Sequence, residues 1–108
     1  MEKRYELRDN GGITYVPLSE IFSFSGDKGN YTIFSIKDSS PVRQSHCVGY
    51  HWDRVKNEGM FFRLNKSDVI NITHVKRIED MTVYLTNGAD FNVWKEEREA
   101  LRKLIPSI

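Results

Sequence analysis

The chain has 108 residues, enough for one domain with a single modest core, and its 39% hydrophobic and 29% charged residues are typical of a globular protein. Many DNA-binding domains are clearly basic, so a net charge of +1 argues mildly against a nucleic-acid partner without excluding one. No apolar run is long enough to cross a membrane, and no basic-then-apolar leader opens the chain. The single cysteine, Cys47, excludes an internal disulfide and a CxxC metal site, so we expect a buried thiol in a reducing compartment.

Short segments rich in aromatic and β-branched residues follow a polar leader at residues 1–12. Turn residues separate these segments, so we expect strands rather than helices. The spacing of Trp52 and Val55, with the stop signal Gly59 behind them, predicts a short helix between Gly49 and Gly59. The strands predicted before this helix cover residues 13–18, 20–26, 31–37 and 42–48.

A further strand is predicted at residues 74–79, followed by a β-hairpin at residues 81–94. The pair Asn87-Gly88 lies between two β-prone runs and favours a two-residue type I′ turn. In that register Tyr84 faces Phe91 across the two strands.

A helix is predicted at the C-terminal end, over residues 95–105. Its first turn is acidic and its last turn is basic, which matches the helix dipole, and Leu101, Leu104 and Ile105 form its apolar stripe. The sequence therefore predicts a single domain of mainly β, or β-rich α+β, class. Its strands are antiparallel, with a short internal helix and a C-terminal helix, and no long helices alternate with strands as a doubly wound parallel sheet requires.

Catalytic and metal-binding patterns are missing from the sequence. The three histidines, His46, His51 and His74, share no ligand spacing, and zinc needs three or four converging ligands. There is no GxSxG elbow and no phosphate-cradling glycine loop. We therefore expect no catalytic residue, no metal and no cofactor, and a protein that is not an enzyme.

The segment FFRLNKSDVIN at residues 61–71 carries hydrogen-bond donors at regular spacing. In a single strand, Arg63, Asn65 and Ser67 would project from one face, with Lys66 on the other. Arginine binds phosphate or guanine with two parallel hydrogen bonds, and hydroxyl and amide groups bind phosphate oxygens. A hydrated strand face is the plainer interpretation of the same residues.

Four motifs in order resemble the LytTR DNA-binding domain of bacterial response regulators. They are Gly29-Asn30-Tyr31, the run Phe61-x-Arg63-x-Asn65-x-Ser67 continued by Val69-Ile70-Asn71, the turn Asn87-Gly88, and Val93-Trp94-Lys95. The resemblance spans about residues 13–105. It implies a LytTR-like β domain that lays loops, rather than a recognition helix, into successive grooves of duplex DNA. The implied function is sequence-specific DNA binding by the output domain of a bacterial, cytoplasmic transcription regulator of a two-component system.

The resemblance also implies which residues bind DNA, in three segments that are far apart in the sequence. The implied set is Lys28 and Asn30 in the first loop, Arg63, Asn65, Lys66, Ser67 and Asn71 in the middle segment, and Lys95 with Arg98 at the last helix. Asn71 is expected at the DNA surface.

Three positions depart from the family pattern. Asn65 replaces a histidine, Lys95 replaces an arginine, and Trp94 replaces a serine. A lysine makes a single-point contact where arginine binds guanine through two hydrogen bonds, so specificity is affected more than binding. Trp94 is expected to anchor the core between hairpin and helix rather than to contact DNA. Asn30 and Asn71 also have a plainer interpretation as turn residues.

The expected partner is double-stranded DNA, as paired short repeats bound by a homodimer, with no membrane. The resemblance further implies a receiver domain, either in the same chain or in a partner regulator. The chief alternative is a pleckstrin-homology-like β-module that binds phosphoinositides or protein partners through basic loops. The two differ in the helix expected between Gly49 and Gly59. A protein-interaction domain is the third interpretation, favoured by the near-zero net charge.

Overall fold

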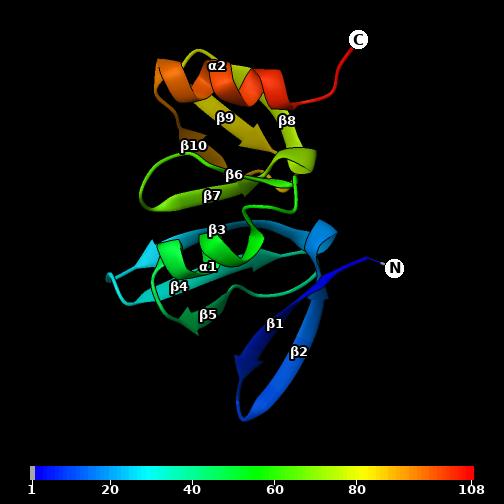
Figure 1. Ribbon diagram of the computed structural model, residues 1–108, viewed down its shortest axis with the longest axis vertical. Helices are drawn as coiled ribbons and strands as arrows, with labels where there is room; N and C mark the ends of the chain where they lie inside the picture. Colours follow the sequence, from blue (N-terminus) through cyan, green and yellow to red (C-terminus); the bar gives the residue numbers. More distant parts are fainter. Residues whose placement is uncertain (1) are drawn as a thin grey trace.

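The computed structural model describes residues 2–108, which form three antiparallel sheets and two α-helices. The sheets are stacked along the long axis of the molecule (Figure 1). The first sheet contains β1 (Arg4–Asp9) and β2 (Gly12–Pro17). The second sheet has five strands, in the order β5 (Val42–Ser45), β4 (Tyr31–Ile36), β3 (Ile21–Asp27), β7 (Asp68–Asn71) and β6 (Phe61–Arg63). The third sheet has the order β10 (Asp90–Asn92), β9 (Thr82–Leu85) and β8 (Val75–Glu79). The helices are α1 (Val48–Val55) and α2 (Lys95–Leu104). The predicted fold class is confirmed.

Two hydrophobic cores lie on opposite faces of the five-stranded sheet. Neighbouring residues of β7 separate them, because Val69 packs in the core beneath α1 and Ile70 packs in the core beneath α2. In β3, Phe24 joins the first core and Phe22 packs against the second. A central strand with both faces buried explains why this segment is so rich in aromatic residues.

The prediction of a polar leader at residues 1–12 is wrong. Residues 4–9 form β1, which pairs with β2 and buries Tyr5 and Leu7 in the first core. The two-residue turn of this hairpin is Asn10-Gly11, with φ of +45° and +79°. Asparagine followed by glycine between alternating apolar residues is the strongest short-range hairpin signal, and both residues tolerate positive φ.

The prediction of one continuous strand at residues 61–71 is also wrong. The segment is a tight hairpin in which Arg63 of β6 pairs with Val69 of β7, and the Leu64 N–H donates to the Asp68 carbonyl at 2.9 Å. The side chains that were expected to share one strand face therefore lie at the end of β6 and in a loop. The alternation of apolar and polar residues that is typical of a strand continues into the turn, because Leu64 at the start of the turn is itself buried.

The last hairpin has a different register from the predicted one. Tyr84 pairs with Asp90 rather than Phe91, and the Leu85 N–H donates to the Ala89 carbonyl at 2.9 Å. The loop therefore contains three residues, with Gly88 at φ +89°. The common three-residue hairpin loop is a type I turn followed by a residue with positive φ, which Gly88 provides here. The predicted two-residue loop is therefore one residue too short.

Both predicted helices are present, but Leu104 and Cys47 are more exposed than predicted. Leu101 is fully buried beneath the third sheet, but Leu104 is half exposed and does not belong to the apolar stripe. The predicted strand at residues 42–48 ends at Ser45, and Cys47 is an exposed residue at the start of α1 rather than a buried thiol. Neither helix of residues 2–108 is long and apolar enough to cross a membrane.

Candidate functional site

Three loops lie along the same side of the molecule, at the left of Figure 1: the β3–β4 loop, the β6–β7 loop and the connection from β10 to α2. The first two loops are joined directly. The Gly26 N–H donates to the Ser67 carbonyl at 2.8 Å, and the Ser25 hydroxyl donates to Asp68 Oδ1 at 2.8 Å. The fold therefore places on one side three segments of which the first and the last are more than sixty residues apart in the sequence.

The β3–β4 loop consists of Lys28, Gly29 and Asn30 between the paired residues Asp27 and Tyr31. Lys28 and Gly29 both have positive φ, at +53° and +76°, which turns the chain within three residues. The side chains of Lys28 and Asn30 are exposed at the tip. A tight hairpin anchored at both ends presents these two side chains on a short and well-supported backbone.

The β6–β7 loop is ordered by its own side chains. Asn65 Oδ1 accepts from the backbone N–H groups of Ser67 and Asp68 at 2.7 and 2.9 Å, and its Nδ2 donates to Asp68 Oδ2 at 3.0 Å. The Arg63 guanidinium donates to the carbonyls of Asn65 and Lys66 at 3.1 and 2.9 Å. Asn65 and Arg63 therefore shape the loop, while Lys66 and Ser67 are exposed.

The prediction that Asn71 sits at the DNA surface is wrong, because its side chain is fully buried. Asn71 Nδ2 donates to the carbonyls of Leu18 and Ile21 at 3.2 and 2.9 Å. Its Oδ1 accepts from the backbone N–H and the hydroxyl of Thr73 at 3.0 and 2.7 Å. Every hydrogen-bonding position of the amide is used inside the protein, so Asn71 ties β7 to the start of β3.

The connection from β10 to α2 carries the largest exposed side chain of the fold. Trp94 is 76% exposed, so the prediction that it anchors the core is wrong. Val93 occupies the core position instead, at 3% exposed, and the alternation along the strand turns Trp94 outward. Lys95, the first residue of α2, is exposed beside it. Alternation from Val93 was the signal that could have predicted this placement.

Arg98 lies one turn into α2 and points back toward the β8–β9 turn. Its Nη1 donates to the Asp80 carbonyl at 2.9 Å, and its Nη2 pairs with Glu99 at 3.2 Å. Its Nε is buried without a hydrogen-bond partner among residues 2–108. This geometry does not bring Arg98 together with the exposed loop residues.

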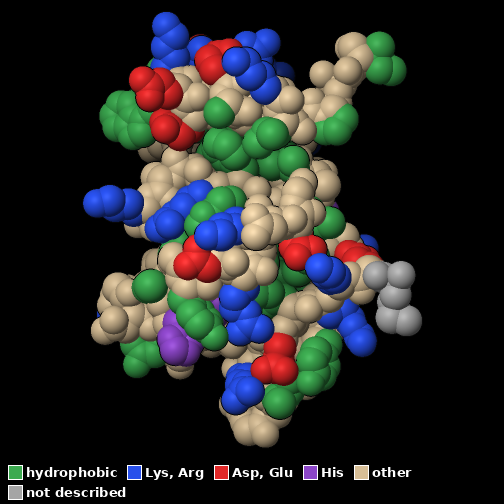
Figure 2. Space-filling view, in the orientation of Figure 1, with side chains coloured by type: hydrophobic (Ala, Val, Ile, Leu, Met, Phe, Trp, Pro, Cys, Tyr) green, Lys and Arg blue, Asp and Glu red, His purple; other side chains and the backbone are tan. Residues whose placement is uncertain are grey.

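The charge on this side of the molecule is set by which groups are already paired. Asp27 pairs with Arg43 at 3.0 Å, and Asp68 accepts from Ser25 and Asn65. Lys28, Lys66 and Lys95 take part in none of the ion pairs found in residues 2–108. Basic side chains project from this side at the level of the β6–β7 loop (Figure 2). Each loop thus offers one lysine for an external anion.

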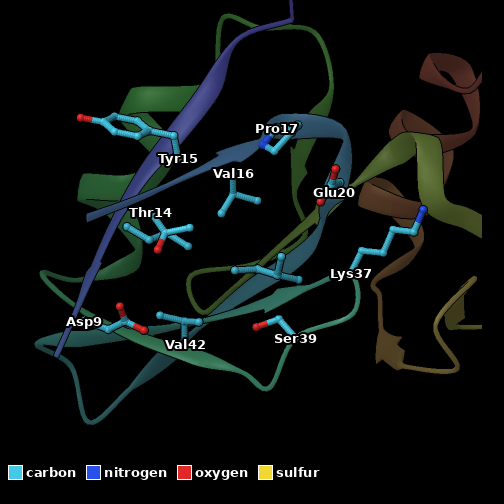
Figure 3. Close-up of a pocket in the computed structure, with 11 residues that line it drawn as sticks. Asp9, Thr14, Tyr15, Val16, Pro17, Glu20, Lys37, Ser39 and Val42 are labelled. Atoms are coloured by element: carbon cyan, nitrogen blue, oxygen red, sulfur yellow. The ribbon is translucent and has the colours of Figure 1, made fainter. Parts of the chain in front are cut away.

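A hollow of about 260 Å³ lies beneath the β1–β2 hairpin, away from these loops. Its polar side chains include Glu20 and Lys37 on one side and Asp9 on the other (Figure 3). They do not converge on one point. Within residues 2–108, no group of three or more histidine, cysteine, aspartate or glutamate side chains is arranged to hold a metal ion.

Comparison with solved structures places the fold. The chain superimposes on a solved structure described as the "LytTr DNA-binding domain of putative methyl-accepting/DNA response regulator" from Bacillus cereus, with a TM-score of 0.73, 19% sequence identity, and coverage of 99% of this chain and 100% of the other. The chain has the LytTR fold. No protein-family model and no curated protein sequence matches it. The LytTR fold agrees with the predicted architecture and departs from the pleckstrin-homology-like alternative, since α1 lies inside the chain between β5 and β6.

Proposed function

We propose that the chain binds duplex DNA in a sequence-specific manner, as the output domain of a bacterial transcription regulator. The observation that carries this proposal is the alignment of three loops on one side of a LytTR fold, each with an exposed lysine that takes part in no ion pair within residues 2–108. Phosphate contacts from lysine supply affinity for any sequence, and side chains that reach base edges supply specificity.

The loops have different roles in this interface. Lys28, Lys66 and Lys95 contact phosphates or base edges, and Asn30 and Ser67 supply short-range hydrogen bonds from exposed positions. The LytTR structure from Bacillus cereus is a DNA-binding domain, which supports the same use of the fold here. We further propose that two copies of the chain bind paired short repeats, and that a receiver domain, in this chain or in a partner regulator, controls binding. Arg63 and Asn65 act by holding the β6–β7 loop in shape, and Asn71 contributes through stability rather than contact.

Selection from a random duplex library at near-physiological salt tests this function. Enrichment of a short motif, especially a repeated one, is the expected result. Retention that disappears as salt rises, with no motif enriched, would indicate attraction to the DNA backbone alone. That result would contradict sequence specificity, while the absence of any retention at low salt would contradict DNA binding itself.

Trp94 provides a second test because it is exposed and lies beside Lys95. We expect Trp94→Ser to weaken binding to the selected duplex about tenfold, since covering a large apolar side chain against the sugars and groove walls contributes at most about 1.5–3 kcal/mol. Its unfolding midpoint should not fall, because the side chain is 76% exposed, and should rise slightly, because Trp94 is the N-cap residue of α2 without a side-chain cap and a serine there stabilises a helix by about 1 kcal/mol. Fluorescence of Trp94 in a Trp52→Phe background should be quenched on DNA binding.

The matched control is Trp52→Phe itself, in the half-buried tryptophan of α1. This variant should bind DNA as the unchanged chain does. Equal binding by Trp94→Ser would show that the tryptophan makes no net contribution to the complex, and tighter binding would show that it obstructs the approach to DNA.

A further inference from the structure

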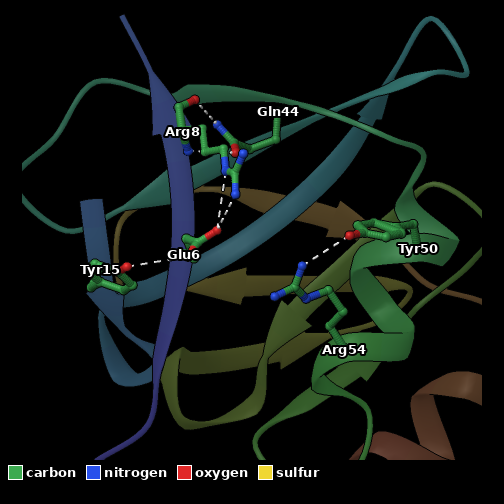
Figure 4. Close-up of polar contacts among 6 residues, drawn as sticks. All are labelled: Glu6, Arg8, Tyr15, Gln44, Tyr50 and Arg54. Carbon is green, nitrogen blue, oxygen red and sulfur yellow. Dashed lines mark hydrogen bonds and ion pairs between the residues drawn. The ribbon is translucent and has the colours of Figure 1, made fainter. Parts of the chain in front are cut away.

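A second concave site lies between β1, β5 and α1, outside the three loops. This hollow, called the anion hollow below, has a volume of about 420 Å³. The side chains around it come from β1 and from β5 and α1, which follow each other in the sequence far from β1 (Figure 4). In Figure 2 basic side chains and a histidine gather over α1 and β1 in the lower half of the visible face.

Arg54 is the principal cation of the anion hollow. Its Nη1 donates to the Tyr50 hydroxyl at 3.1 Å, and its guanidinium lies over the Tyr5 ring at 5.2 Å from the ring centre. Arg54 takes part in none of the ion pairs found in residues 2–108. A guanidinium has five N–H donors, so an arginine that donates one of them to a hydroxyl is held in position and still has donors for an external oxyanion.

Arg8 enters the anion hollow from the opposite wall. Buried Gln44 fixes its backbone, because the Arg8 N–H donates to Gln44 Oε1 at 3.0 Å and Gln44 Nε2 donates to the Arg8 carbonyl at 2.8 Å. The Arg8 side chain pairs with Glu6 at 3.1 Å, and Glu6 also lies within 3.5 Å of the Tyr15 hydroxyl. The carboxylate is therefore held on the β1–β2 side (Figure 4). The pKa of Arg54 is raised mainly by its hydrogen bond to Tyr50 and in smaller part by Glu6, so this carboxylate acts on Arg54 across the hollow.

The floor of the anion hollow is polar but uncharged. His51 Nε2 donates to the Ser45 carbonyl at 2.8 Å, so its Nδ1 accepts from the Tyr5 hydroxyl at 2.5 Å. Burial lowers the pKa of His51 and raises the pKa of Tyr5 to about 12, which keeps both side chains neutral at pH 7. His46 stacks on Tyr50 at the rim, with ring centres 4.0 Å apart. Among the described residues that line the hollow, Glu6 is the one carboxylate, and it pairs with Arg8; Arg43, also in the lining, pairs with Asp27.

We propose that the anion hollow binds a phosphate group through Arg54. Arg54 takes part in no ion pair within residues 2–108 and can donate to the phosphate, while Arg8 holds the Glu6 carboxylate and so limits its repulsion of the anion. The phosphate comes from one of two sources: a phosphodiester of duplex DNA that extends past the loops, or a free phosphate monoester. Only the first source rests on the proposed function.

The first arm of the test uses inorganic phosphate with the full chain. Amide and arginine N–H resonances of residues 8, 44–46, 50 and 54 are followed by NMR while phosphate replaces chloride at constant ionic strength. We expect saturable shifts at these residues, and affinity at least tenfold lower in Arg54→Gln. The control Lys56→Gln removes a charge from the end of the same helix, where Lys56 pairs with Asp53, and should bind phosphate as the unchanged chain does.

The second arm measures duplex affinity for the same variants over a range of chloride concentrations. A phosphodiester source predicts that Arg54→Gln lowers the salt slope by about one unit, since each phosphate contact contributes about 0.9. A free monoester source predicts an unchanged slope together with saturable phosphate binding. If Arg54→Gln and Lys56→Gln behave alike in both arms, the proposal is overturned. Failure of the chain to bind any duplex would contradict the proposed function, and the phosphate titration would then decide the anion hollow alone.

Discussion

Asn71→Ala is expected to lower the free energy of unfolding by about 3 kcal/mol, because buried groups left without a hydrogen-bond partner cost about 1–3 kcal/mol each. The substitution removes both donations to the carbonyls of Leu18 and Ile21, and it leaves the Thr73 N–H without its acceptor. Urea denaturation followed by circular dichroism measures the loss. At temperatures where the variant remains folded, its affinity for DNA should equal that of the unchanged chain.

Asn92→Ala is the matched control, since Asn92 is an exposed asparagine of β10. Its unfolding free energy should change by less than about 0.5 kcal/mol, as for most surface substitutions. If Asn71→Ala kept the normal unfolding midpoint and lost DNA affinity instead, the side chain would have to reach the DNA surface. The buried position described above would then be incorrect.

The strands and helices of the second and third sheets follow from local sequence signals. Aromatic and β-branched runs mark β3 and β4, and the charge gradient of residues 95–105 marks α2. Two of the turns also carry local signals that the predicted elements do not include. The pair Asn10-Gly11 carries the two-residue signal that was assigned to Asn87-Gly88, and the run from Asn65 to Asp68 consists of turn residues. Both turns lie inside segments with another predicted structure, the leader at residues 1–12 and the continuous strand at residues 61–71.

The candidate site could be predicted only where exposure follows from the loop itself. Lys28, Lys66 and Lys95 lie at loop tips or at a helix start, so their exposure follows from local structure. Asn71 could not be placed in this way, because the carbonyls that hold it belong to residues about fifty positions away in the sequence. The anion hollow was not predicted for the same reason. Arg8, Gln44 and Arg54 converge only after β1 packs beside β5 and α1.

The combined variant Lys28→Gln, Lys66→Gln and Lys95→Gln is expected to weaken duplex binding about a hundredfold at ~0.15 M salt. If each lysine neutralises one phosphate, the salt slope should fall by about 2.7 units, since each contact contributes about 0.9. Stability should be almost unchanged, because all three side chains are exposed and none takes part in an ion pair within residues 2–108. Fluorescence anisotropy with the selected duplex, over a range of chloride concentrations, gives both the affinity and the slope.

The control replaces Lys3, Lys37 and Lys103, which are also exposed but lie outside the three loops. Both triple variants change the formal net charge from +1 to −2, because each loses three positive charges. A general effect of net charge would weaken both equally, which would contradict an interface formed by the loops. Loss confined to the loop variant would show that the three loops contact one duplex together. Since a single loop can account for only about one unit of slope, the size of the change also reports how many loops are engaged.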